Sequence, residues 1–285
     1  MTLSVNLGPR LKLVASFIPQ GASLGDIGTD HGYLPIYLWE IGRIKKAVAV
    51  DVHKGPYESA CETIQSRNLS EVIDVRLGDG LLPLKVGEVD TLTLAGMGGN
   101  TMLEIFKPRP DIMAQIQHLI LQPQGAEGKV RHTLTKEGWK LKEEELVTEE
   151  GRIYVVMHYT REEGYTFAQI QNKGEEWYQK TTPLIMSFLS DTKESSTKES
   201  STKEFTDSDE FKSLVLRWVW DLGPHILENP TLQLLTFIED QQNFLKRTLK
   251  QMEKATQTSV LPKIKKFQNS IYVLEGFKRC LFPLV

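Results

Sequence analysis

Residues 24–35 read Leu24-Gly25-Asp26-Ile27-Gly28-Thr29-Asp30-His31-Gly32-Tyr33-Leu34-Pro35, an apolar run that passes through a glycine-rich turn into a helix-like run. A strand, a turn and a helix in this order are typical of an open α/β sheet, where ligands bind at the carboxyl ends of strands. Glycines in the turn let a ligand approach the backbone without obstruction by a Cβ atom. The segment therefore predicts a ligand-binding turn.

The expected ligand is cationic. The spacing of the glycines is not the G-x-G-x-x-G of dinucleotide-binding proteins, and Asp26 and Asp30 stand where a dinucleotide would place its pyrophosphate. Two carboxylates repel phosphate but attract a positively charged, amine-bearing ligand. This favours S-adenosyl-L-methionine over NAD.

The chain around this turn alternates strand-like and helix-like runs. Short runs rich in Val, Ile and Leu predict strands at residues 23–28, 47–50, 72–77, 89–95, 118–122, 140–147 and 152–159. Helix-length segments between them are residues 33–42, 56–68, 99–107 and 127–137. Such β-α-β alternation predicts a doubly wound, Rossmann-like α/β fold, with a parallel sheet covered by helices on both faces.

Acidic and glycine residues follow several of these strands. Asp51 ends the second strand, where it can accept hydrogen bonds from both ribose hydroxyls, and Gly78-Asp79-Gly80 ends the third, where a carboxylate can accept from the adenine amine. The glycines of residues 95–100 leave room beside a reactive methyl group. Together these strand ends predict a class I methyltransferase. The expected cofactor-binding residues are Asp26, Gly28, Asp51, Asp79, Gly80, Ala95, Gly96 and Met97.

The second half of the chain has a different pattern. Residues 1–160 are expected to form the catalytic domain, and residues 161–285 a smaller α-helical, coiled-coil-like domain with apolar residues at helical spacing in 177–189, 211–222 and 232–264. The pentapeptide Thr-Lys-Glu-Ser-Ser occurs at 192–196 and again at 197–201, without an apolar residue. It predicts a flexible polar insertion at about residues 190–208.

Charge is uneven along the chain. The protein carries a net charge of −3, but residues 246–285 hold nine basic and two acidic residues. A basic segment on an acidic protein can bind the phosphates of a nucleic acid, although a solvated helix face would have the same composition. The alternative RNA surface is the catalytic face, with Arg10, Arg43, Lys45 and Lys46. The expected RNA-binding residues are Arg10, Lys246, Arg247, Lys263, Lys265 and Lys266.

Composition excludes several classes of protein. Two distant cysteines, Cys61 and Cys280, exclude a disulfide scaffold and a cysteine-rich metal module, and they favour the reducing cytoplasm. The histidines have no metal-ligand spacing, so no metal is expected. No basic leader with an apolar core begins the chain and no run approaches the ~20 apolar residues of a membrane helix, so neither secretion nor a membrane is expected.

Five segments together resemble the TrmK family of bacterial tRNA (adenine-22-N1)-methyltransferases: residues 26–35, 55–60, 75–81, 94–99 and 119–124. The resemblance covers about residues 8–160. It implies a Rossmann-like catalytic domain, a C-terminal coiled-coil domain, S-adenosylmethionine as cofactor and tRNA as partner, with no obligate protein partner. Departures from the family pattern are mild at Thr29, Gly32, Asp51 and Gln124, while the repeat resembles an insertion and the tail after Phe267 an extension.

The implied reaction is attack of adenine N1 on the sulfonium methyl group, which needs alignment more than covalent catalysis. Asp30 is expected to stabilise the charge that develops on the base, with His31 as a proton relay or merely a helix cap, and Asn100 to hold the adenine edge. Three alternatives remain open: a methyltransferase for another RNA adenine, a nicotinamide-dependent oxidoreductase that uses Asp51, and an RNA-binding module with a degenerate core.

Overall fold

The computed structural model describes residues 5–191, 206, 208–253 and 261–283. The chain divides into two compact units, Met1–Thr166 and Phe167–Val285, and each is described by itself. The Thr-Lys-Glu-Ser-Ser repeat, expected to be a flexible insertion, lies outside the described residues.

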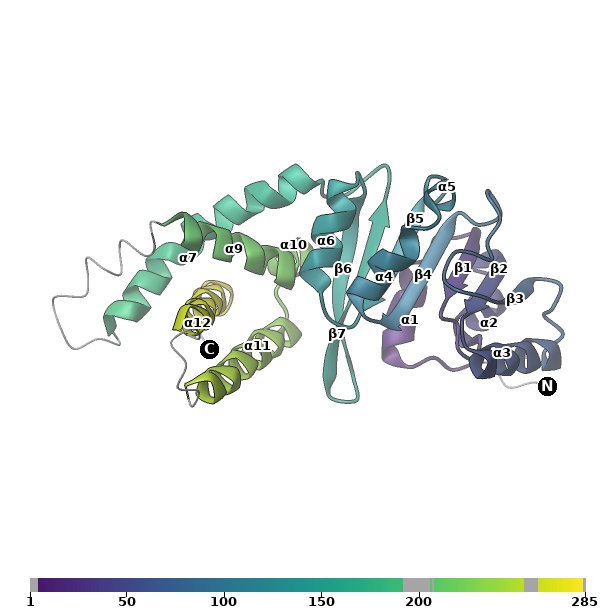
Figure 1. The fold of residues 1–285 in the computed structure, drawn as a ribbon, viewed down its shortest axis with the longest axis horizontal. Coiled ribbons are helices and arrows are strands. Elements are labelled where there is room, and N and C mark those ends of the chain that lie inside the picture. The colour runs from purple at the N-terminus through teal and green to yellow at the C-terminus, as the bar shows by residue number, and fades with distance from the viewer. Residues whose placement is uncertain (1–4, 192–205, 207, 254–260, 284–285) are drawn as a thin grey trace. The chain divides into compact units, whose positions relative to one another are not determined.

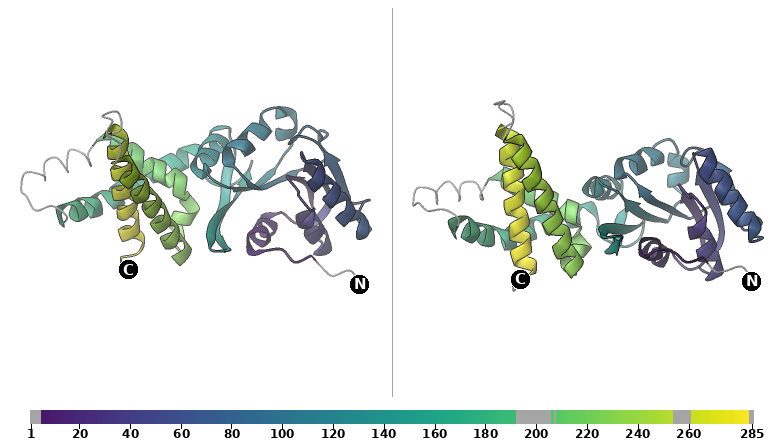
Figure 2. Two further views of the ribbon diagram at one scale, coloured as in Figure 1. Left: turned by 60° about the horizontal axis from the view of Figure 1, so that its bottom comes forward. Right: turned by 90° about the horizontal axis from the view of Figure 1, so that it is seen from below.

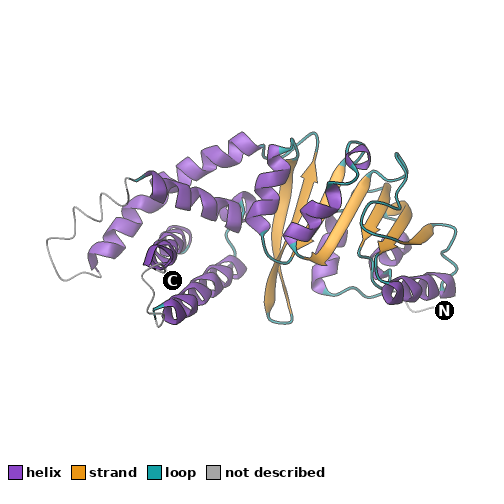
Figure 3. Cartoon of the chain, in the orientation of Figure 1, coloured by secondary structure: helices purple, strands orange, loops and turns teal. Residues whose placement is uncertain are grey.

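Unit 1 is built on a seven-stranded sheet in the order β3-β2-β1-β4-β5-β7-β6 (Figures 1 and 3). Its strands are β1 (Ala22–Ile27), β2 (Ile44–Asp51), β3 (Ile73–Leu77), β4 (Thr91–Met97), β5 (His118–Pro123), β6 (Lys140–Glu149) and β7 (Arg152–Thr160). All seven predicted strands are present, and the Rossmann-like fold is confirmed. The strand order reverses at β1, which pairs with β2 on one side and β4 on the other. This switch point is where open α/β sheets bind ligands.

Helices cover both faces of the sheet. They are α1 (Pro9–Phe17), α2 (Tyr33–Glu40), α3 (Lys54–Ser66), α4 (Gly99–Phe106), α5 (Pro110–Met113) and α6 (Glu127–Lys136). Helices α4 and α6 pack against each other in front of the strands in Figure 1, whereas α1 packs against α2 on the opposite face. Sequence reasoning did not predict α1, although Pro9 at its first position suits a helix start.

The last strand differs from the expected parallel arrangement. Strand β7 is antiparallel to both β5 and β6, so β6 and β7 form a hairpin at the edge of the sheet. A β-α-β unit returns the chain parallel to its start, but the two-residue turn after β6 reverses it instead. Glu150 and Gly151 form this turn with φ of +50° and +72°, as tight hairpin turns require.

The connection from β3 to β4 contains no helix. Residues 78–90 run through successive turns, with backbone hydrogen bonds such as Leu82 N–H to Asp79 C=O. Leu84 and Val89 are buried, and both approach Gly25 on β1. Apolar side chains of this loop therefore cover part of the sheet. We refer to residues 78–90 as the β3–β4 loop.

Unit 2 is helical among its described residues. Its helices are α7 (Phe167–Asp191), α9 (Asp209–Leu222), α10 (Pro224–Glu228), α11 (Leu232–Met252) and α12 (Leu261–Leu281). Figure 2 shows α11 and α12 side by side as an antiparallel pair. Ring contact between Trp177 and Phe277, at 5.1 Å, joins α12 to α7. The described part of the tail after Phe267 is therefore part of the packed unit.

Two helices of unit 2 depart from their expected bounds. Helix α7 begins ten residues before Trp177, at Phe167, whose ring contacts Trp220. The stretch expected over 232–264 ends at Met252, and a separate helix begins at Leu261. Pro262 is the second residue of α12, a position that proline favours because its missing N–H has no helical partner there. In the described part of the chain, no helix is long and apolar enough to span a membrane.

Candidate active site

Asp26 lies at the base of the glycine-rich turn, at the switch point of the sheet. Its side chain is buried, and its two oxygens accept hydrogen bonds from Thr29 Oγ1 at 2.6 Å and Thr93 Oγ1 at 2.7 Å. Desolvation raises the pKa of Asp26 above its ordinary value, although these two hydrogen bonds oppose the shift. The carboxylate therefore holds the end of β1 against β4 and offers negative charge beside the turn.

The turn itself has left-handed backbone at three positions. Gly28, Asp30 and Gly32 have φ of +77°, +54° and +71°. A Cβ on Gly28 would lie 2.9 Å from Met97 Cε, the end of a flexible side chain, so the left-handed conformation is the main reason for glycine here. Asp is one of few side chains that tolerate this backbone. The turn thus opens the backbone of residues 28–32 toward the carboxyl end of the sheet.

Asp51, at the end of β2, fixes two neighbouring loops. One oxygen accepts from the Asp30 N–H at 3.1 Å, and the other accepts from the His53 N–H at 2.9 Å. The side chain is only 6% exposed. Each carboxylate oxygen has a second lone pair, so two further donors can bind without displacing the backbone. Asp51 therefore stabilises the turn and can still accept hydrogen bonds from the two hydroxyl groups of a diol.

A cavity of about 180 Å³ adjoins the end of β3. Asp79, Gly80, Leu81 and Leu82 form one wall, and Thr101, Glu104, Ile105 and Pro108 form the other. Gly80 has φ of +54°, and a Cβ there would lie 2.8 Å from Ile105 Cγ2, so the walls meet closely at this point. We call this cavity the Asp79 pocket. An acidic group in a partly apolar recess suits a flat heterocycle with an exocyclic amine.

A buried polar side chain positions the end of β4. Gln122 on β5 is fully buried, and its Oε1 accepts from the Gly96 N–H at 3.1 Å and from Arg10 Nη1 at 2.7 Å. Arg10 also pairs with Glu149 at 3.1 Å and is 20% exposed. Arg10 was expected to bind RNA, but its guanidinium group is bound to Gln122 and Glu149 of the protein itself. Ala95, Gly96 and Met97 form the end of the strand that it holds.

Two of the three expected catalytic residues, Asp30 and His31, lie side by side, and the third is Asn100. His31 Nε2 is 3.7 Å from Asp30 Oδ2, and its Nδ1 is 2.6 Å from Ser59 Oγ. The imidazole stacks on the Tyr33 ring at 5.2 Å, with 21° between the planes. Both side chains are largely exposed, at 66% for Asp30 and 46% for His31. They form an open surface that a nucleobase can reach and stack upon.

Asn100 is exposed at the start of α4, and its Oδ1 accepts from Lys129 Nζ at 2.7 Å. Its amide N–H groups are the part that could meet an adenine edge. The other expected RNA-binding residues, Lys246, Arg247, Lys263, Lys265 and Lys266, are all exposed on α11 and α12 of unit 2.

Sequence reasoning missed the groups that support the site. Thr29, Thr93 and Gln122 do not appear among the expected site residues, yet they hold Asp26 and Gly96 in place. A signal was available for two of them, because Thr93 and Gln122 are polar residues within apolar strands. A buried polar side chain requires a partner, so each marks a specific contact.

The raised pKa of Asp26 predicts a pH-dependent ligand affinity. A cationic ligand binds the ionised carboxylate, so affinity should fall as pH falls through the pKa of the folded state. The Asp26→Asn variant should bind more weakly at neutral pH and show a flatter pH profile. Calorimetric titration with S-adenosylmethionine at a series of pH values from neutral downward measures both. If affinity depended on pH in the same way in both proteins, Asp26 would not be the carboxylate that binds the cationic ligand.

The same shift makes a prediction for the free protein. The folded state binds the Asp26 proton more tightly than the unfolded state, so ionisation costs stability as pH rises above the unfolded pKa of about 4. Asp26→Asn should therefore melt no lower than the wild type at neutral pH without ligand. This control separates loss of ligand binding from loss of fold.

Residues 7–157 match a family model described as "Methyltransferase domain". A Bacillus subtilis protein named tRNA (adenine(22)-N(1))-methyltransferase is 39% identical over 153 residues, which are 54% of this chain. The match spans 64% of that relative's length. A Mycoplasma pneumoniae relative is 28% identical over 59% of this chain and 76% of its own length.

Two solved structures align with more than nine-tenths of this chain. The crystal structure of the B. subtilis m1A22 tRNA methyltransferase TrmK is 25% identical, with a TM-score of 0.72, and the alignment covers 96% of this chain and 99% of that one. A Streptococcus pneumoniae protein solved in complex with S-adenosyl-L-methionine is 27% identical, with a TM-score of 0.64 and coverage of 92% and 98%.

Proposed function

The chain belongs to the methyltransferase domain family, and we propose that it transfers a methyl group from S-adenosylmethionine to N1 of adenine 22 in tRNA. The observation that carries the proposal is the row of acceptors and open backbone at the ends of four adjacent strands: Asp26, Asp51, Asp79 and Gly96. Family membership favours this reading over the nicotinamide-dependent oxidoreductase, and relatives named for the reaction favour adenine 22 over another RNA adenine.

The site fits S-adenosylmethionine by its shape and its chemistry. The Asp79 pocket would hold the adenine, with the carboxylate accepting from the exocyclic amine. Asp51 would hold the ribose through its unused lone pairs, and the turn at Gly28 beside Asp26 would hold the amine-bearing end. Ala95, Gly96 and Met97 would border the sulfonium. When bound, the cofactor supplies an activated methyl group.

The protein's task in this reaction is to present adenine N1 to that methyl group. N1 is hydrogen-bonded within an RNA helix, so the base must leave its pair, and the Tyr33 and His31 rings offer a surface for it to stack upon. The adenine becomes cationic as N1 is methylated, and the Asp30 carboxylate stabilises that charge. His31 can accept a proton that leaves N6 and pass it to solvent. Asn100 would hold the edge of the base.

We assign cofactor binding to unit 1 and the anchoring of tRNA to unit 2. Helices α11 and α12 are antiparallel neighbours, so the last turns of α11 and the first turns of α12 form one end of the pair. That end carries exposed Lys246, Arg247, Lys263, Lys265 and Lys266, which we call the basic tip. By contrast, Lys278 and Arg279 at the other end of α12 pair with Glu239 and Glu275. Among the described residues of α11 and α12, the basic side chains without a carboxylate partner thus gather at the tip.

The proposed reaction can be tested directly. The protein should be incubated with S-adenosylmethionine and total tRNA that lacks the modification, and the methylated nucleotide mapped by mass spectrometry. We expect 1-methyladenosine at position 22. Methylation at another adenine would support the fold and cofactor but overturn the target. Absence of any methylated base, with cofactor binding retained, would favour the RNA-binding module.

A further inference from the structure

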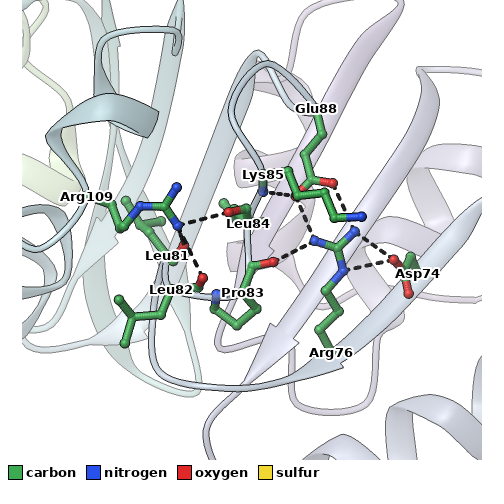
Figure 4. Close-up of polar contacts among 9 residues, drawn as sticks. All are labelled: Asp74, Arg76, Leu81, Leu82, Pro83, Leu84, Lys85, Glu88 and Arg109. Carbon is green, nitrogen blue, oxygen red and sulfur yellow. Dashed lines mark hydrogen bonds and ion pairs between the residues drawn. The ribbon is translucent and has the colours of Figure 1, made fainter.

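The β3–β4 loop, which forms one wall of the Asp79 pocket, is bound by two arginines (Figure 4). The loop has no helix of its own. Its Leu81 and Leu84 side chains are buried, whereas Leu82 between them is 54% exposed. Burial therefore anchors the loop at Leu81 and Leu84 and contributes little at Leu82. In addition, guanidinium groups bind the backbone carbonyls of the loop from both sides.

Arg109 holds the side of the loop that faces the pocket. Its Nη1 donates to the carbonyl oxygens of Leu81 and Leu82, each at 3.2 Å, and of Leu84 at 2.9 Å. Its Nε and Nη2 donate to the two carboxylate oxygens of Asp111 at 2.9 and 2.8 Å. These bonds raise the pKa of Arg109. Asp111 thus orients the planar guanidinium group of Arg109, and Nη1 binds the loop.

Arg76 holds the far side of the same loop. Its Nη1 donates to the Pro83 carbonyl at 2.7 Å, and its Nη1 and Nη2 bind both oxygens of Glu88 at 2.7 and 2.9 Å. Burial works to raise the pKa of Glu88, but the hydrogen bonds from Arg76 and the Lys85 N–H outweigh it, and the pKa is lowered. Arg76 therefore anchors the loop to β3, away from the pocket.

Arg109 is the one of these two arginines that joins both walls of the pocket. Its backbone follows Pro108, which lines the α4 wall, and its side chain reaches the carbonyls of Leu81 and Leu82 in the opposite wall. The side chain is 19% exposed. This bridge links the wall that contains Asp79 to the wall that contains Pro108.

We propose that Arg109 is a positioning residue for adenine recognition: it sets the width of the Asp79 pocket and so the selectivity for a 6-amino purine. The inference rests on the proposed use of the pocket for the cofactor's adenine. Arg109 itself does not touch the ligand. Its effect should appear in the affinity and selectivity for the purine and not in the methyl-transfer step.

The test compares S-adenosylhomocysteine with S-inosylhomocysteine, which lacks the exocyclic amine. The wild type should bind the adenine compound about tenfold or more tightly, as expected when a polar group loses its partner. In Arg109→Gln, affinity for S-adenosylhomocysteine should fall about tenfold and the preference between the two ligands should approach one. Asp111→Asn, which leaves Arg109 in place without its orienting carboxylate, should give a smaller change in the same direction.

Kinetics separate positioning from a general loss of structure. For Arg109→Gln, the KM for S-adenosylmethionine should rise while the KM for tRNA and the kcat at saturating cofactor are retained. Arg67→Gln is the matched control, because the Arg67 side chain is similarly shielded, at 17% exposed, and pairs with Glu40 at 2.9 Å, and neither residue lines the pocket. It should keep wild-type affinity and selectivity.

Unchanged selectivity in both Arg109→Gln and Asp111→Asn would overturn the inference. So would an equal loss of affinity for both ligands accompanied by a fall in kcat, which indicates a structural role only. If the wild type binds neither ligand, the proposed function fails instead. If the wild type binds both with equal affinity, the pocket does not recognise the amine and the inference fails by itself.

Discussion

Replacing Asp51 with alanine should lower the affinity for S-adenosylmethionine by well over tenfold. The carboxylate braces the turn through the N–H groups of Asp30 and His53, and in the proposed complex it also accepts from the ribose. A hydrogen bond to a charged group contributes about 1.5–3 kcal/mol, so the loss of even one is worth roughly tenfold or more. Calorimetric titration of the folded variant measures the change.

The neighbouring Asp30→Asn variant is the control for this prediction. Asparagine tolerates the left-handed backbone at this position and keeps the N–H that Asp51 accepts. We expect its cofactor affinity to stay near that of the wild type, while its turnover falls. Unchanged affinity in a folded Asp51→Ala protein would remove Asp51 from the binding site. A collapse of affinity in Asp30→Asn would make Asp30 a cofactor ligand.

Reversing the charge of Lys263, Lys265 and Lys266 together should reduce tRNA affinity by at least a hundredfold at low salt. The three side chains are exposed in the first turns of α12, so their substitution leaves the packing of Val273, Leu274 and Phe277 intact. Each phosphate contact releases counterions, and the slope of log affinity against log salt should become shallower by about one unit per contact. Electrophoretic mobility shifts at several salt concentrations give both quantities.

The comparison is a triple variant with the same change of charge on unit 1, Arg43→Glu, Lys45→Glu and Lys46→Glu. If tRNA is anchored at the basic tip, this protein should keep most of its affinity. The opposite pattern, with tRNA lost from the unit 1 variant and kept by the α12 variant, would place the RNA on the catalytic face. Cofactor affinity should be unchanged in the α12 variant.

The strands were predictable because each is a short apolar run bounded by turn-forming residues. The run Ala47 to Val50, for example, is short, contains two β-branched residues and lies between Lys46 and Asp51, which is typical of a buried strand. The direction of β7 was not predictable from its own residues. Its composition suits either orientation, and the two-residue turn at Glu150 and Gly151 decides between them.

Part of the candidate site was predictable for a similar local reason. Asp26, Asp51 and Asp79 end successive strands, and parallel strands bring their carboxyl ends to one edge. The supporting residues come from distant positions: Gln122 meets Gly96, and Arg109 meets the carbonyl of Leu81. Backbone carbonyls carry no sequence signal, so a partner of this kind cannot be read from residue types.

The link between Arg10 and Glu149 has a consequence for the order of folding. These residues are 139 positions apart, and Arg10 also binds the Gln122 that holds Gly96. On the ribosome, this closure must wait until the β6–β7 hairpin has left the exit tunnel, whereas β1 and β2 can pair much earlier. A contact of such long range is a late, slow event in folding. Nascent chains arrested before residue 149 should therefore bind cofactor poorly, and the competent state should emerge only once that hairpin has been synthesised.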